Sequence, residues 1–384
     1  MISIVSVVFP ALIVQYVSPI ENSPISSWET GPIAFPLIVT NIIFFGIVLA
    51  YYKNKLPLLI TKAIKFIFNF EISKRITFIV LAIMMGLYIT SSIGELGDEE
   101  RGVDSIRIIE KTENWSMEEF FAKEQDVPFR FFLLSSSIEL FDNIRVIPYI
   151  ASIALVILIY FITLELSQKR FAGLVAVAII LQSFVFLKYD TISTYDNFWT
   201  LFYILSLYLI YKTWPLSSIL FVLSLLSKPL TAVFLPMTLF FIYRAELPHK
   251  KKVYLAISYF VLIGIGLSII AITNLHLVKT SVEFSGFYFW QGFTSVAHSL
   301  RFDFLVILFL LPLTVGLFIA SRKGIIQADS ILILIAGILF SAPLLTGFTD
   351  LTNQPYRFIP LIVFFSIGVG IILSKKEQKI IKET

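Results

Sequence analysis

The sequence is dominated by apolar runs whose lengths approach that of a membrane span. Hydrophobic residues make up 57% of the 384 residues and charged residues 15%, whereas soluble domains carry roughly 25% charged residues. A transmembrane helix needs about 20 apolar residues to cross the hydrocarbon core, and the apolar–polar alternation of a transmembrane barrel does not recur in this chain. The sequence therefore predicts an all-α polytopic membrane protein.

The apolar runs predict about 12 membrane-crossing segments. The first of them lacks the basic n-region and the small-residue cleavage site of a secretory signal peptide, so we interpret it as a span. The expected segments are residues 2–20, 33–52, 76–94, 144–166, 171–188, 197–212, 216–228, 229–243, 253–273, 303–321, 330–347 and 356–373.

Basic residues concentrate in alternate loops, which indicates the orientation of the chain. With 12 crossings, 19 basic and 6 acidic residues lie on one side of the membrane, and 11 basic and 20 acidic residues lie on the other. Cytoplasmic loops carry an excess of Lys and Arg. We therefore expect both termini in the cytoplasm, a plasma-membrane location, and a large extracytoplasmic first loop over residues 95–143.

This charge pattern requires residues 216–243 to cross the membrane twice. Each limb is then short, at 1.5 Å of rise per residue, and Pro229 interrupts the helical hydrogen bonding in the middle of the stretch. We expect two half-length limbs that meet at an outward-facing Lys228. The alternative is one long, kinked helix with a snorkelling lysine, which would break the charge pattern.

The first outer loop is unusually acidic. Thirteen of the 26 acidic residues of the chain fall between Gly94 and Asp142, including the cluster Asp98-Glu99-Glu100-Arg101 close to the end of a span. Farther along the loop, Ser116 and Glu119 form a capping-box pattern that predicts a short amphipathic helix on the membrane surface. Carboxylates so close to a bilayer point to chemistry on a lipid head group.

Several other classes of protein are excluded by composition. The chain has no cysteine and three isolated histidines, so zinc-finger, haem and disulfide frameworks lack ligands. The basic residues are sorted by membrane side, so the pI near 9.0 does not predict nucleic-acid binding.

Acidic and basic residues both gather at the predicted outer ends of the spans. A carboxylate there can deprotonate an acceptor, while cations neutralise a phosphate leaving group. Charged residues beside spans are also often only solvated helix ends, so their arrangement as a set carries the argument. The set consists of Asp98, Glu99, Arg101, Asp190, Asp196, Lys228, Arg301 and Arg357.

The order of short motifs along the chain is informative. They are Asp98-Glu99-Glu100-Arg101, the segment Leu140–Pro148, the run Lys169–Ala176 with its Ala-Gly-Leu, Tyr195-Asp196-Asn197-Phe198-Trp199, Leu225-Leu226-Ser227-Lys228, and Tyr356–Pro360. Over residues 76–373 this order resembles the GT-C superfamily of polyprenyl-phosphate-sugar-dependent glycosyltransferases, which includes protein O-mannosyltransferases and lipid A aminoarabinose transferases. Gly102 stands where that family usually has tyrosine.

The resemblance implies inverting transfer of a sugar from a polyprenyl-phosphate donor to an acceptor at the extracytoplasmic face. It assigns Asp98 as the general base, assisted by Glu99. It assigns the lipid phosphate to four cations, Arg101, Lys228, Arg357 and, more weakly, Arg301. If a divalent metal ion takes part, Asp196 and Glu99 are its expected ligands; no other cofactor is implied.

The resemblance also divides the chain into regions. Residues 1–75 form two accessory spans and a basic cytoplasmic loop, residues 76–373 form the GT-C-like domain, and residues 374–384 form a short basic tail. The donor lipid, membrane lipids and a membrane protein bound through residues 1–52 are the expected partners. Two alternatives stay open: a non-catalytic membrane subunit that scaffolds a larger complex, and a transporter.

Overall fold

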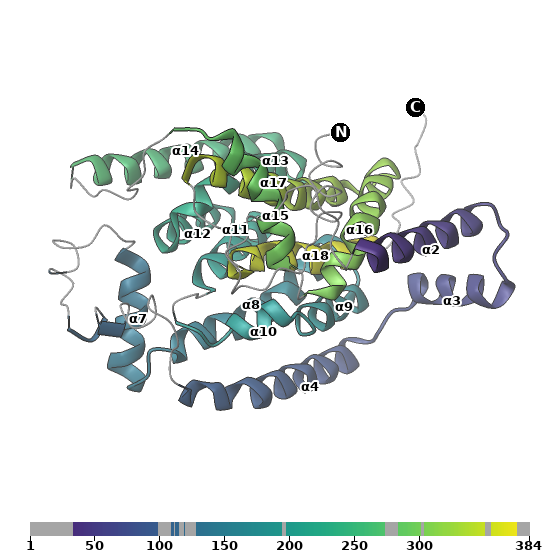
Figure 1. Ribbon diagram of the computed structural model, residues 1–384, viewed down its shortest axis with the longest axis horizontal. Coiled ribbons are helices and arrows are strands. Elements are labelled where there is room, and N and C mark those ends of the chain that lie inside the picture. The colour runs from purple at the N-terminus through teal and green to yellow at the C-terminus, as the bar shows by residue number, and fades with distance from the viewer. Residues whose placement is uncertain are drawn as a thin grey trace.

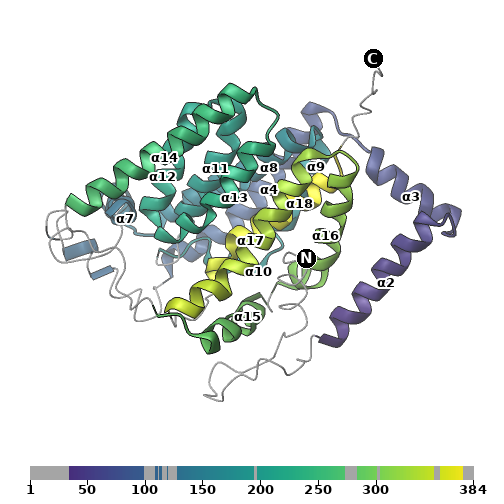
Figure 2. The same ribbon diagram turned by 90° about the horizontal axis from the view of Figure 1, so that it is seen from above.

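The computed structural model describes residues 34–98, 109, 110, 112–114, 119, 128–193, 197–272, 283–300, 303–349 and 355–374. Across these ranges the regular secondary structure is helical, without a β-strand. Most helices gather into one bundle, and α2 and α3 project from its side (Figure 1, Figure 2). The predicted all-α class is confirmed.

In chain order, the helices of the described ranges are α2 (Ala34–Tyr52), α3 (Leu58–Asn69), α4 (Lys74–Ser92), η1 (Ile93–Gly97), α7 (Pro128–Phe141), α8 (Val146–Ser167), α9 (Arg170–Ile180), α10 (Phe184–Tyr189), α11 (Phe198–Lys212), α12 (Trp214–Ser227), η2 (Pro229–Phe234), α13 (Leu235–Arg244), α14 (His249–Ile272), α15 (Gly286–Leu300), α16 (Phe304–Arg322), α17 (Ile326–Thr349), η3 (Pro355–Phe358) and α18 (Ile359–Ile372).

The protein is a multi-pass membrane protein. Among the described residues, 6 helices are long and apolar enough to cross a membrane. They are Phe35–Tyr52, Lys74–Gly97, Val146–Ser167, Phe304–Arg322, Gln327–Phe348 and Pro355–Ile372. Several other predicted spans are shorter apolar helices, and the predicted first span lies outside the described residues. The number of about 12 crossings therefore stays a prediction.

The core of the bundle is built around α18. Its sequence is apolar on all sides, which is typical of a helix surrounded by other helices, and it packs against α8, α9, α16 and α17. Glycines allow close contacts among α8, α9 and α18. A Cβ atom on Gly173 would lie 2.8 Å from the Tyr160 ring, and one on Gly370 would overlap Thr163 and lie 3.0 Å from the Ala172 carbonyl oxygen.

Residues 214–244 form the predicted pair of antiparallel limbs. Ser224, near the end of α12, donates a 2.6 Å hydrogen bond to the carbonyl oxygen of Trp199 at the start of α11. Near the end of α13, Phe241 packs against Tyr211 at the end of α11, with ring centroids 6.0 Å apart. The chain therefore reverses direction at Lys228, and the single kinked helix is excluded.

The expected continuous span 171–188 is divided in the structure. Helix α9 ends at Ile180, and α10 begins only at Phe184. The hydroxyl of Ser183 accepts a hydrogen bond from the Phe186 amide (2.9 Å), and Asp303 accepts one from the Val185 amide (3.2 Å). These side chains cap the start of α10, so a second, separate helix leads to Asp190.

The segment predicted to be the first outer loop is partly helical. Helix α7 occupies its second half, a helix that the apolar pattern did not predict. The helix predicted at Ser116 lies outside the described residues, as do Glu99, Glu100 and Arg101 of the acidic cluster.

Charged residues sort to two opposite ends of the bundle. At the basic end, α9 begins and α11, α13 and α16 finish, and ion pairs join Glu71 to Arg170 (3.7 Å), Glu165 to Lys212 (2.6 Å) and Asp329 to Arg244 (2.6 Å). At the acidic end, α4 and α12 finish and α8 and α11 begin. The carboxylates of Glu95, Asp98 and Asp190 lie there.

Candidate active site at the acidic end

The end of α4 is fixed to the rest of the bundle by hydrogen bonds around Glu95. Arg145 donates a 2.8 Å hydrogen bond to the backbone oxygen of Glu95, and Asn143 donates a 2.9 Å bond to that of Leu96. The Glu95 carboxylate accepts a 3.0 Å hydrogen bond from the hydroxyl of Thr191. The start of the acidic loop is thus tied to the segment before α8 and to the residues after α10.

Asp190 is a buried carboxylate directly beside this junction. Its side chain is 1% exposed, and burial raises its pKa from 3.8 to about 7, although the hydroxyls of Tyr88 and Ser92 partly lower it. Its backbone oxygen accepts a 2.7 Å hydrogen bond from Ser152. A carboxyl group with a pKa near neutrality can exchange a proton at physiological pH, which is common at functional sites.

Lys228 lies at the turn between α12 and η2. The following proline disfavours helical backbone at this residue, and Lys228 accordingly adopts φ −156° and ψ 116°. Its ammonium group lies 4.6 Å from the centre of the Tyr356 ring and 5.3 Å from that of Trp199. Aromatic faces attract a cation and hold it in place.

Arg357 shares the same tyrosine. Its guanidinium carbon lies 5.8 Å from the centre of the Tyr356 ring, and the ring of Tyr356 packs edge-on against Tyr189, with centroids 5.8 Å apart. Two cations on one aromatic residue create a local positive potential that suits an anion, and arginine matches phosphate oxygens in particular.

The acidic and cationic groups are joined by a short segment of chain. Tyr189 contacts Tyr356 on the cationic side, while Asp190 and Thr191 reach Glu95 on the acidic side. Residues from distant parts of the sequence therefore meet around three consecutive residues. This arrangement can bind an anionic group beside a proton acceptor.

Only some of the predicted site residues lie in the part of the chain that the structure describes. Lys228 and Arg357 both lie beside the Tyr356 ring, and their role in phosphate binding stays a prediction. Asp98 is exposed and lies just after η1, where its amide donates a 3.1 Å hydrogen bond to the Glu95 carbonyl oxygen. The remaining predicted residues lie outside the described part of the chain, namely Glu99, Arg101, Asp196 and Arg301.

The structure adds Glu95 and Tyr356, which were not among the predicted site residues, and it buries Asp190, which the sequence placed in the charged set. Glu95 and Asp190 are each the first acidic residue after an apolar run, and Tyr356 precedes the predicted Arg357. Their position at the end of an apolar run could have pointed to them, but many charged residues at such positions are only exposed to water. Within the described ranges, no group of three potential metal-binding side chains occurs.

The comparison with protein families finds a match to part of the chain. Residues 125–270 match the family model described as dolichyl-phosphate-mannose-protein mannosyltransferase. The resemblance predicted from the sequence is thereby confirmed for this stretch. The matched stretch contains Asp190 and Lys228, whereas Asp98 and Arg357 lie outside it.

The other two comparisons add no relative. Neither the curated proteins nor the solved structures gave a match to the chain. The apolar helices indicate a multi-pass membrane protein, and residues 125–270 of it are similar to the mannosyltransferase family.

Proposed function

We propose that the protein transfers a sugar from a polyprenyl-phosphate donor to an acceptor, with inversion, at the extracytoplasmic face of the cell membrane. The observation that carries this proposal is the mannosyltransferase match over residues 125–270. The contact of Lys228 and Arg357 with one tyrosine at the acidic end supports it, because the leaving group of this reaction is a lipid phosphate.

The cations stabilise the leaving group in the proposed reaction. The bond between the anomeric carbon and the phosphate oxygen breaks, and its electron pair stays on the lipid phosphate. Lys228 and Arg357 bind this phosphate as its negative charge grows, together with Arg101 and Arg301 from the adjoining loops. Preorganised charges of this kind typically accelerate a reaction by about 10²–10³-fold.

Asp98 acts as the general base in this proposal. Its exposed carboxylate removes the proton of the acceptor while the acceptor attacks the anomeric carbon from the side opposite the phosphate. Glu99 assists it, or joins Asp196 as a ligand of a divalent metal ion. The hydrogen bonds of Glu95 support this role, because they fix the backbone that leads to Asp98.

Glu95 and Asp190 serve as positioning residues. Asp190 is too deeply buried to touch a lipid head group, and the Glu95 carboxylate is hydrogen bonded to Thr191. Together they hold the end of α4 against α8 and the segment after α10, which sets the distance between Asp98 and the cations.

The proposed orientation rests on charge. The basic end carries Lys169, Arg170, Arg244 and Lys250–Lys252, and positive charge is retained on the cytoplasmic side. The acidic end, with the candidate active site, then faces outward.

Transfer of label from a polyprenyl-phosphate sugar tests the proposal. Membranes from cells that express the chain are incubated with radiolabelled polyprenyl-phosphate mannose and with other sugars on the same lipid. We expect label in an acceptor only when the chain is present. Absence of transfer from every donor, together with copurification of the chain in one large complex, would reject the enzyme in favour of the scaffold.

A further inference from the structure

We propose that α3 lies in the head-group layer of the membrane at the basic end of the bundle and binds anionic phospholipids there. This inference does not depend on sugar transfer. It rests on the sequence of α3, on its position between two membrane-spanning helices, and on the contacts that fix its end to α9.

The sequence of α3 separates polar from apolar residues around the helix. At 100° per residue, the polar residues fall on one face and three isoleucines on the opposite face, with Phe66 and Phe68 between the two faces. The polar residues are Thr61, Lys62, Lys65 and Asn69, and the isoleucines are Ile60, Ile64 and Ile67. No acidic residue occurs from residue 34 to residue 70. A basic polar face opposite a bulky apolar face is typical of helices that lie in a membrane interface.

The apolar face of α3 is not covered by the bundle. The helix contains no buried residue, and Leu59 and Phe66 are 81% and 63% exposed. Exposed apolar surface of this kind marks a contact with a membrane or a partner. The views of the whole molecule show α3 at the side of the bundle, beside the end of α2 (Figure 2).

The neighbouring helices place α3 at the membrane surface. Helices α2 and α4, which precede and follow it, are both among the helices able to span a membrane. The 12 residues of α3 join the two, so α3 lies where both leave the hydrocarbon. Lys53 and Lys55 precede it, and Lys74 and Arg75 follow it. This concentration of positive charge complements anionic head groups.

Contacts with α9 fix the orientation of α3. Lys169 is 1% exposed, and its ammonium group donates hydrogen bonds to the carbonyl oxygens of Phe68 (2.8 Å) and Ile67 (3.4 Å). A cation at the C-terminus of a helix satisfies its last carbonyl groups and opposes the helix dipole. The ring of Phe70 also packs edge-on against Phe171, with centroids 5.0 Å apart.

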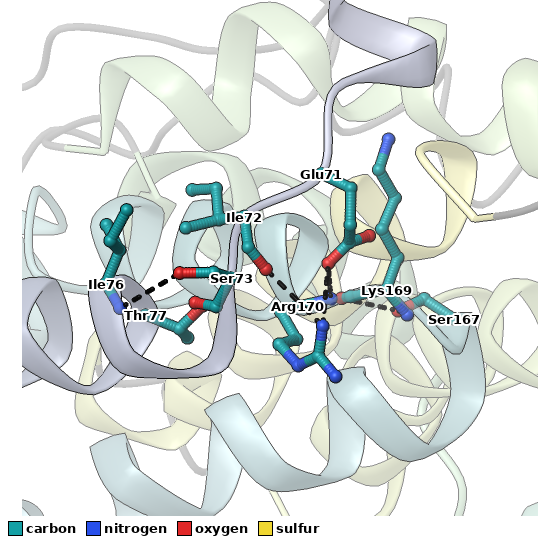
Figure 3. Close-up of polar contacts among 8 residues, drawn as sticks. All are labelled: Glu71, Ile72, Ser73, Ile76, Thr77, Ser167, Lys169 and Arg170. Carbon is teal, nitrogen blue, oxygen red and sulfur yellow. Dashed lines mark hydrogen bonds and ion pairs between the residues drawn. The ribbon is translucent and has the colours of Figure 1, made fainter.

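The chain after α3 is held at the same place. Glu71 accepts a 3.2 Å hydrogen bond from the backbone amide of Arg170, and Arg170 donates a 3.4 Å bond to the carbonyl oxygen of Ile72 (Figure 3). Ser73 then caps α4 by accepting from the amide of Ile76. Both ends of the connection are thus tied to α9, so α3 stays close to the bundle and Lys62 and Lys65 remain on its outer surface.

Selective contact with anionic lipid tests the proposal in the full-length protein. The chain has no cysteine, so Phe66→Cys provides a single labelling site at the border between the apolar and basic faces for an environment-sensitive fluorophore. The labelled protein is reconstituted in phosphatidylcholine vesicles. Quenching is then compared between spin-labelled phosphatidylglycerol and spin-labelled phosphatidylcholine. Ile79→Cys on α4, a site 59% exposed, is the matched control.

We expect phosphatidylglycerol to quench the label at position 66 more strongly than phosphatidylcholine, and both lipids to quench position 79 equally. Each basic residue near an anionic surface contributes about fivefold in relative affinity, so Lys62→Gln with Lys65→Gln should lower the preference by roughly 30-fold. Equal quenching at position 66 would overturn the anionic-lipid proposal. Quenching by neither lipid would overturn it in favour of a second copy of the chain as the covering partner.

Discussion

The two ends of the bundle use their charged residues differently. At the basic end, several charged side chains meet in ion pairs or cap helices: Glu165 pairs with Lys212, Asp329 pairs with Arg244, and Lys169 caps α3. At the acidic end, Asp190 is buried with hydroxyl groups beside it, and Lys228 and Arg357 lie on an aromatic ring. The ion pairs mainly fix structure, whereas Lys228 and Arg357 beside the Tyr356 ring are suited to binding an anion, and the buried Asp190 serves to position the end of α4.

The largest effect is expected for Asp98→Asn, which removes the proposed base at the acidic end. Loss of a general base typically lowers turnover by about 10²–10⁴-fold, and sugar transfer in membranes measures it. Asp142→Asn is the control, because Asp142 lies in the same loop with φ 52°, a conformation that asparagine tolerates. The control should retain full transfer and expression, and wild-type turnover by Asp98→Asn would reject the assignment.

Lys228→Gln tests the cationic half of the acidic end. Removal of a charge that stabilises the leaving phosphate should lower turnover by about 10²–10³-fold, and Lys228→Arg should recover part of it. The control is Lys188→Gln, an exposed cation that also lies near tyrosine and phenylalanine rings. Equal losses in Lys228→Gln and Lys188→Gln would show that the positive charge acts only through the general surface potential.

The pH dependence of stability distinguishes the buried carboxyl groups. Burial raises the pKa of Asp190 to about 7 and that of Asp303 to about 6. Between about pH 4 and these values the unfolded chain has lost the proton while the folded protein keeps it, so stability falls as pH rises. For Asp190 this loss is at most about 4 kcal/mol.

Thermal unfolding in detergent from about pH 4 to about pH 8 measures this effect. Asp190→Asn should reduce the fall in stability that occurs as pH rises to about 7. Asp303→Asn should flatten it only up to about pH 6, and its amide oxygen can still accept the hydrogen bond from Val185. An unchanged pH profile in Asp190→Asn would show that this carboxyl group is ionised in the folded protein.

A pair of glycine substitutions tests the structural role of close packing nearer the basic end. Gly370→Ala should destabilise the protein by about 1–3 kcal/mol, because the added methyl group would overlap Thr163 and press on the Ala172 carbonyl. Gly86→Ala, in α4, meets no neighbour within 4 Å and should stabilise its helix slightly. Thermal unfolding of both variants measures the contrast, which disappears if α18 can shift away from α8.

The smallest effect is expected from an ion pair at the basic end. Glu165→Gln leaves Lys212, whose side chain is 44% exposed, to interact with water. An exposed pair contributes no more than about 1 kcal/mol, so unfolding should change little and sugar transfer not at all. A large loss of transfer would show that the basic end takes part in sugar transfer. The proposal that only the acidic end carries the active site would then be wrong.

Part of the candidate site was predictable from the sequence because it depended on local signals. Pro229 after Lys228 forces an extended residue between two apolar limbs, so the turn was predicted correctly. The division of residues 171–188 was missed because Ser183 caps α10 with the help of Asp303, which lies far away in sequence. Helix α3 was missed as well, since its apolar run is too short to count as a span.

The sequence by itself determined the membrane class, the alternation of charge and the order of motifs, because apolar run lengths and charge positions are fixed by the chain alone. Only the tertiary structure decided which of the many residues at span ends meet. Glu95 is hydrogen bonded to Thr191, and Lys228 lies on the ring of Tyr356. In both pairs the residues are far apart in sequence, so no local pattern predicts the contact. The burial that raises the pKa of Asp190 likewise depends on α4 and α8 packing over it.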